Sequence, residues 1–223
     1  MSVGTAAPDA EHRVDIERHL AEQGWAMRAA IALVALLAAP ALAATEEFVV
    51  ESAHTYPSFE VSHLGISTQR GRFDRSSGRI VMDREAGTGT IDIVIDASTV
   101  STGNKTLDAM LRDEDFFNVA RFPTMTFRAG SIEFEAGVPR RVTGDFTMLG
   151  VTRPMEVSVA RFGCTMLPFL VRLTCGADVV ATLRRSDFGM TAYSAFVGDE
   201  VRLEIQIEAV RQEPAAQPPP AGA

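Results

Sequence analysis

The chain has 223 residues, of which 46% are hydrophobic and 22% charged, and its formal net charge is −8 at pH 7. This composition excludes a disordered acidic tail. The acidic balance also argues against nonspecific nucleic-acid binding, which requires an excess of Lys and Arg. Two cysteines are too few to build a four-ligand zinc site alone. The length allows one large β domain or two small domains.

The first 43 residues carry the pattern of an export signal. Arg28 is followed by the apolar run Ala29–Leu37, and Ala41–Ala43 fits the small-x-small cleavage rule. We therefore predict a cleaved signal peptide over Met27–Ala43, with translation starting at its first residue and residues 1–26 being an upstream extension. The alternative is an uncleaved membrane anchor, although the run is shorter than the about 20 residues of a transmembrane helix.

Cleavage after the signal leaves residues 44–223, with 18 basic and 24 acidic side chains. Export places this mature chain in the periplasm, which is an oxidising compartment. Residues 213–223 are rich in Pro and Ala and are predicted to form a disordered tail. The part between, 44–212, contains no linker and no repeat. We therefore predict one domain, long enough to bury a substantial core.

The dominant period in this domain is two. Residues 90–96 and 201–208 alternate apolar and polar side chains, as expected for strands with one buried face. Similar runs, each bounded by Gly, Pro, Asp or Asn, cover 48–52, 58–63, 71–75, 78–83, 124–134, 141–148, 155–162 and 172–184. Their number and spacing predict an all-β antiparallel sandwich or barrel.

One segment departs from the period of two and predicts a short amphipathic helix over 104–112. Its apolar side chains follow the i, i+3, i+4 spacing. They are Leu107, Met110 and Leu111. We expect a second short turn to follow, in which Phe116 and Phe117 plug an edge or end of the domain.

Few side chains offer chemistry. His54 and His63 have no acidic residue at metal-ligand spacing, so we predict no metal site. The sequence contains no Gly-x-Ser-x-Gly elbow, no phosphate-binding loop and no dinucleotide fingerprint. The adjacent acids Asp113, Glu114 and Asp115 point in different directions, so they are expected to cap the second turn and not to act as paired carboxylates. We predict no catalytic residue, no enzyme and no cofactor.

The two cysteines, Cys164 and Cys175, lie near the ends of two successive predicted strands. In an exported chain the expected state is a disulfide that closes this hairpin. A redox pair is the alternative, but the sequence has no Cys-x-x-Cys and no flanking helix to activate a thiolate. We therefore favour a structural disulfide.

The inward-facing side chains of the predicted strands are mostly apolar. From periodicity alone they either fill a solid core or line an apolar ligand channel, because a barrel of about eight strands has room for either. The candidates are Phe59, Val61, Ile93, Ile95, Phe127, Phe146, Met148, Val157, Val159, Leu203 and Ile205.

A set of short motifs occurs in order along almost all of 48–211. The motifs are 54–65 (HTYPSFEVSHLG), 70–73 (RGRF), 95–104 (IDASTVSTGN), 111–117 (LRDEDFF), 122–127 (FPTMTF), 142–154 (VTGDFTMLGVTRP), 185–189 (RSDFG) and 197–201 (VGDEV). Each alone is weak, but the ordered set resembles the YceI-like family, whose members are bacterial periplasmic lipid- or polyisoprenoid-binding proteins.

The resemblance implies an extended, eight-stranded antiparallel lipocalin-like β-barrel with a short helical segment near one end. It also implies an elongated apolar cavity for an isoprenoid lipid, such as a polyprenyl compound or an isoprenoid quinone, bound as ligand. The predicted function is that of a carrier. The predicted ligand-binding residues are the inward candidates above, with His63 as a polar group at the mouth, and Leu107, Met110, Leu111, Phe116 and Phe117.

One loop departs from the family pattern. Many relatives have a long polar loop where this chain has the apolar segment 166–170, between the two cysteines. This segment either contacts a membrane surface or partner, or folds back and packs. Two other functions stay open: a lipid-modifying enzyme that uses His63 or the acids at 113–115, and a structural or stress-response module with a filled core. A homodimer through an open sheet edge also stays open.

Overall fold

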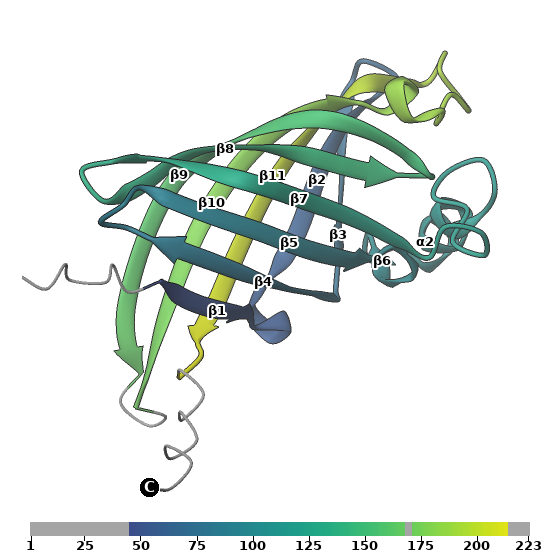
Figure 1. Ribbon diagram of the computed structural model, residues 1–223. Coiled ribbons are helices and arrows are strands. Elements are labelled where there is room, and N and C mark those ends of the chain that lie inside the picture. Colours follow the sequence, from purple (N-terminus) through teal and green to yellow (C-terminus); the bar gives the residue numbers. More distant parts are fainter. Residues whose placement is uncertain (1–44, 168–170, 214–223) are drawn as a thin grey trace, which may run out of the picture. The chain divides into compact units, whose positions relative to one another are not determined.

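Antiparallel strands make up most of the computed structural model, which describes residues 45–167 and 171–213 (Figure 1). These residues all belong to the unit Ala43–Ala223. The predicted signal peptide and almost all of the predicted tail lie outside the described residues. The strands are β1 (Glu46–Val50), β2 (Tyr56–His63), β3 (Ser67–Phe73), β4 (Ser76–Asp83), β5 (Thr88–Asp96), β6 (Val100–Ser101), β7 (Thr124–Glu135), β8 (Val138–Met148), β9 (Val151–Leu167), β10 (Arg172–Arg184) and β11 (Val197–Arg211).

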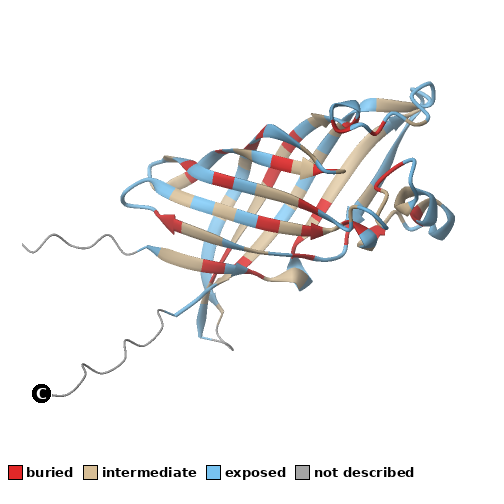
Figure 2. Ribbon diagram, turned by 45° about the vertical axis from the view of Figure 1, so that its right-hand side comes forward, coloured by how far each residue is buried: buried red, intermediate tan, exposed pale blue. Residues whose placement is uncertain are grey.

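The sheet closes into a barrel of eight strands. Around the ring the order is β1-β4-β5-β7-β8-β9-β10-β11, and β11 pairs back with β1. Buried and exposed residues alternate along the strands (Figure 2), which is the pattern that the period of two predicts. The predicted lipocalin-like antiparallel barrel is thus confirmed. Among the described residues, no helix is long and apolar enough to cross a membrane.

The strand beside β11 is broken in its middle. β11 pairs with β1 near its C-terminal end and with β2 along its N-terminal two thirds. The 3-10 turn η1 (Ser52–His54) separates β1 from β2. At the break, the buried Thr55 hydroxyl donates to the carbonyl oxygen of Glu208 (3.2 Å) and accepts from its N–H (3.1 Å). These bonds replace the missing ladder bonds, so β2 can lead away into β3 and β6.

Helix α2 (Lys105–Arg112) lies near one end of the barrel (Figure 1). Two polar side chains anchor it. The buried Asp108 accepts from the N–H and the hydroxyl of Thr102 at 2.6 and 2.7 Å. One turn later, Arg112 donates to the carbonyl oxygens of Ser98 and Val100 at 2.7 and 2.8 Å. The side of α2 that carries Asp108 and Arg112 therefore faces residues 98–102, the segment that contains β6. We call this end of the barrel the helical end.

The opposite end is closed by a small apolar cluster. Phe48 is fully buried (0% exposed) and packs there with Met82, Cys175 and Ala209. These side chains come from the adjacent strands β4, β1, β11 and β10. Phe134 of β7 and Phe162 of β9 pack against them, so the cluster reaches across the barrel and plugs it. We call this the disulfide end.

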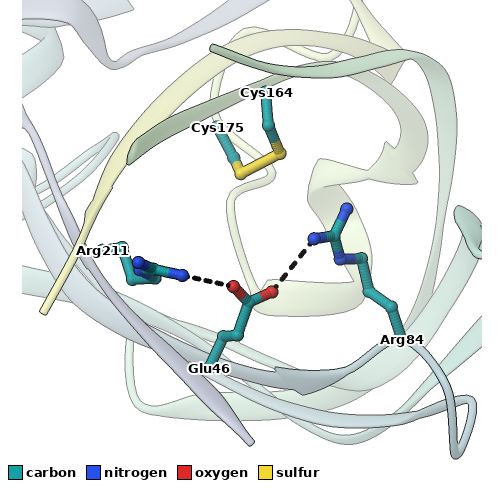
Figure 3. The surroundings of a disulfide bond; sticks show 5 residues. All are labelled: Glu46, Arg84, Cys164, Cys175 and Arg211. Atoms are coloured by element: carbon teal, nitrogen blue, oxygen red, sulfur yellow. Dashed lines mark hydrogen bonds and ion pairs between the residues drawn. A yellow bond between two sulfur atoms is a disulfide. The ribbon is translucent and has the colours of Figure 1, made fainter. Parts of the chain in front are cut away.

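The predicted disulfide between Cys164 and Cys175 is present at this end (Figure 3). The two cysteines are direct partners in the β9–β10 ladder. In the same view, the Glu46 carboxylate accepts from Arg84 (3.2 Å) and Arg211 (3.0 Å). These ion pairs connect the start of β1 to the turn after β4 and to the end of β11.

Removing the disulfide is expected to lower the free energy of unfolding by about 2–4 kcal/mol, because the bond restricts the unfolded chain. The measurement is chemical denaturation of the Cys164→Ala/Cys175→Ala variant and of the unsubstituted protein, each with and without reductant. Reductant should destabilise the unsubstituted protein alone. A double variant as stable as the oxidised protein would contradict this expectation.

Candidate functional site: an apolar cavity inside the barrel

The barrel is hollow. The volume open to the centres of water molecules is about 190 Å³, whereas one water needs only about 10–15 Å³ by this measure. The wall exposes only apolar atoms. It extends from Ile80 and Ile207, near the plug at the disulfide end, to Met190 and Val197 at the helical end. Periodicity alone allowed either a solid core or an apolar channel, and the structure has a cavity.

Most of the residues predicted to bind ligand lie on this wall. They come from strands around the barrel and from the segment at and after α2, because alternate residues of each strand point inward. Those that line the cavity are Phe59, Val61, Ile93, Ile95, Leu111, Phe116, Phe117, Phe127, Phe146, Met148, Val157, Leu203 and Ile205. Their role in binding stays a prediction.

Four predicted residues do not line the cavity. Val159 packs against the main apolar core but does not line the cavity. His63 is the last residue of β2, at the helical end, where it pairs with Val197. Leu107 and Met110 are also absent from the wall, and Met110 is 43% exposed.

The expectation that Leu107 and Met110 face the lumen is corrected by the anchoring of α2. Residues 108, 111 and 112 lie on one side of a helix with 3.6 residues per turn. Because Asp108 and Arg112 are held by hydrogen bonds to the chain around β6, only Leu111 of the predicted apolar face reaches the cavity. The spacing predicted the helix, but polar contacts decide its rotation.

Sequence reasoning also missed part of the wall. Ile91, Val201 and Ile207 belong to the same alternating runs as the predicted residues, so their period could have identified them. Arg185 and Met190 come from a short 3-10 turn and a loop, where no period exists. The missed lining residues are Thr55, Pro57, Ser58, Phe73, Ile80, Ile91, Met125, Val142, Met155, Val179, Leu183, Arg185, Met190, Val197, Val201 and Ile207.

Aromatic side chains form one side of the wall. The rings of Phe59, Phe73 and Phe117 contact one another, with centres 5.2 to 6.4 Å apart. The Phe59 ring lies over Gly71, its partner on β3, and a Cβ at Gly71 would come within 2.4 Å of this ring. The absence of a side chain at Gly71 therefore makes room for the aromatic cluster.

The Arg185 guanidinium organises the loop at the helical end. Arg185 begins η3 (Arg185–Phe188) and is only 3% exposed. It donates to four backbone carbonyl oxygens, those of Met190 (3.0 Å), Ala192 (2.8 Å), Val197 (3.0 Å) and Gly198 (2.9 Å). Its donors are thus directed at the loop backbone, and the cavity wall stays apolar although an arginine contributes to it.

A carboxylate fixes the same loop at its base. Asp199 accepts from the N–H and from the hydroxyl of Ser186, both at 2.9 Å. These two hydrogen bonds hold the pKa of the Asp199 carboxyl below its usual value. Desolvation opposes this shift, and the charges of Arg184 and Arg185 make smaller contributions that also lower the pKa.

The groups considered for catalysis are not placed at the cavity. Neither His63 nor the acids at 113–115 line its wall. Within 45–167 and 171–213, no group of three or more His, Cys, Asp and Glu side chains could hold a metal ion. The site in this part of the chain is defined by shape and apolarity.

The fold and the cavity together define a lipocalin-like β-barrel with an apolar interior. Residues 48–209 match the YceI-like domain, and the chain belongs to this family. It is 31% identical over 187 residues to a UPF0312 protein of Pseudomonas paraeruginosa, covering 82% of this chain and 97% of that protein. It is 29% identical over 174 residues to protein YceI of Salmonella arizonae, covering 78% and 90% of the two chains.

Solved structures share the barrel. A Campylobacter jejuni YceI protein aligns with a TM-score of 0.58 at 26% identity, covering 68% of this chain and 90% of that one. A polyisoprenoid-binding domain from Saccharophagus degradans aligns with a TM-score of 0.54 at 15% identity, covering 74% and 98%. At that identity the second likeness concerns the fold alone.

Proposed function

We propose that the protein binds an isoprenoid lipid in the barrel cavity and carries it through the periplasm. The observation that carries this proposal is the hollow, wholly apolar interior. Membership of the YceI-like family supports it, as does the polyisoprenoid-binding domain of Saccharophagus degradans, which has the same fold. The predicted signal peptide supports the periplasmic location.

The ligand is expected to be a long apolar chain, such as the tail of a polyprenyl compound or an isoprenoid quinone. Exposed to water, such a chain costs about 25 cal/mol per Å² of apolar surface, and the cavity wall removes that surface from water. The plug around Phe48 and Met82 closes the disulfide end, so it limits the length of chain that the barrel accepts. The head group then lies at the helical end, where His63 ends β2.

The role proposed is binding without catalysis. A lipid-modifying enzyme would need reactive side chains next to the bound chain. The candidates named for such a reaction, His63 and the acids at 113–115, are not on the wall. Replacing Asp113 with Asn should therefore leave ligand uptake unchanged.

The test is to identify what the protein holds after gentle purification. Native mass spectrometry and solvent extraction should detect a prenyl species bound with a stoichiometry of one per chain. Protein stripped of lipid should then take up ubiquinone from detergent micelles. Recovery of lipid-free protein alone, together with no uptake of ubiquinone, would overturn the proposal. The mass of the exported protein also reports whether residues 1–43 are removed.

A further inference from the structure

An apolar surface is exposed at the helical end of the barrel. The turn between β2 and β3 exposes Leu64 and Ile66, and Ile66 is 82% exposed. The loop between η3 and β11 exposes Tyr193 and Phe196, and Phe196 is 54% exposed. We call these four side chains the mouth patch. Large apolar side chains that gather on one face of a protein mark a site of interaction.

The fold holds the mouth patch together. The Leu64 N–H donates to the carbonyl oxygen of Phe196 over 2.7 Å, and the Phe196 N–H donates to the carbonyl oxygen of Tyr193 over 2.9 Å. The Tyr193 ring stacks on Phe116, with ring centres 5.7 Å apart. The two segments that carry the patch lie side by side at the top right of Figure 1. The exposed side chains therefore occupy a single surface.

The segments that carry the patch have no formal charge. Residues 64–69 and 188–198 contain no Asp, Glu, Lys, Arg or His. Charged groups across a protein interface fix the register and exclude wrong partners, and these segments offer none. Exposed turns with aliphatic and aromatic side chains suit the boundary between headgroups and acyl chains of a bilayer. The chemistry of the patch thus favours a lipid surface over a protein.

The mouth patch also adjoins the cavity. Val61 and Val197 line the cavity wall. Val61 lies three residues before Leu64 in the chain, and Val197 directly follows Phe196. Phe116, whose ring stacks with that of Tyr193, lines the same wall. A surface that enters the bilayer at this end would bring the acyl chains next to these wall residues.

We propose that the mouth patch docks the barrel onto a phospholipid bilayer, so that the isoprenoid moves between bilayer and cavity without crossing water. This inference rests on the carrier function proposed above. Ile66 and Phe196 enter the boundary of headgroups and acyl chains. Because the affinity for the bilayer comes from the burial of apolar area and not from charges, we expect it to be independent of the salt concentration.

The test compares Ile66→Asp and Phe196→Asp with Met166→Asp. Met166 is 53% exposed but lies at the disulfide end, so it is a matched control. All variants are produced and purified in the same way. Any removal of residues outside the described part of the chain therefore affects all of them equally. Flotation with palmitoyl-oleoyl-phosphatidylcholine vesicles measures binding at low and high salt. Vesicles that contain ubiquinone measure the rate of transfer.

Each mouth variant is expected to lose vesicle affinity at least about tenfold, because a charge replaces a side chain whose burial supplies the binding energy. The transfer rate should fall by the same factor, and Met166→Asp should behave like the unsubstituted protein. A second measurement needs no loss of function. It uses a background in which Trp25, the single Trp, is replaced by Phe. In this background, brominated phosphatidylcholine should quench the fluorescence of the indole introduced by Ile66→Trp, but not of that introduced by Met166→Trp.

Three results would overturn docking by the mouth patch: vesicle binding unchanged in both mouth variants, binding lost in Met166→Asp instead, or binding abolished by salt. Uptake of ubiquinone from detergent micelles separates this inference from the carrier function. Normal micelle uptake with any of these three results overturns docking alone. If the unsubstituted protein takes up no ubiquinone from micelles, the carrier function fails instead.

Discussion

Replacing Val157 with Trp is expected to weaken the uptake of isoprenoid quinone strongly while the barrel stays folded. Val157 is buried on β9 and lines the cavity. An indole ring at this position would occupy the space that the proposed ligand needs. We expect the apparent affinity for ubiquinone to fall at least about tenfold, which corresponds to about 1.4 kcal/mol. Quinone titration of the lipid-free protein measures this change.

The matched control is Ser158→Trp, because Ser158 is the next residue on β9 and is exposed on the outside of the barrel. It should bind ubiquinone like the unsubstituted protein. The stability of Val157→Trp gives a second criterion. Overpacking a filled core costs about 1–3 kcal/mol, whereas a ring that enters existing space should cost less than about 1 kcal/mol. Strong destabilisation with unchanged quinone binding would contradict the hollow interior.

Replacing Arg185 with Ala is expected to lower the free energy of unfolding by more than about 3 kcal/mol. The substitution removes the partner of four carbonyl oxygens in the loop at the helical end. Each buried polar group left without a partner costs about 1–3 kcal/mol, and water that enters the site offsets part of the sum. Urea denaturation measures the loss. Hydrogen exchange of the amides at 190–198 should show that this loop opens first.

Arg184→Ala is the control for this substitution, because the neighbouring Arg184 is exposed and surface changes of this kind cost within about 0.5 kcal/mol. Arg185→Lys tests the geometry. A lysine keeps the charge but lacks the planar fork of five donors, so it should recover only part of the stability. Full recovery by lysine would show that the charge, and not the set of hydrogen bonds, holds the loop.

Local patterns explain how much of this structure the sequence could predict. The alternation at 90–96 and 201–208 predicted two strands. In the structure these residues form parts of β5 and β11. The spacing around Leu107 predicted α2, but its rotation depends on Thr102, Ser98 and Val100, which no helical period reveals. The break at Thr55 could not be predicted either, because it depends on Glu208 at the other end of the domain.

By itself, the sequence determined the strands, the family and the disulfide, since alternation, ordered motifs and a pair of cysteines can be recognised along the chain. Only the tertiary structure decided that the interior is hollow. The volume left between side chains depends on how far opposite walls stand apart, and that distance is set by the closure of the whole ring. It also decided the place of Arg185, since burial among four carbonyl oxygens is a property of the folded loop.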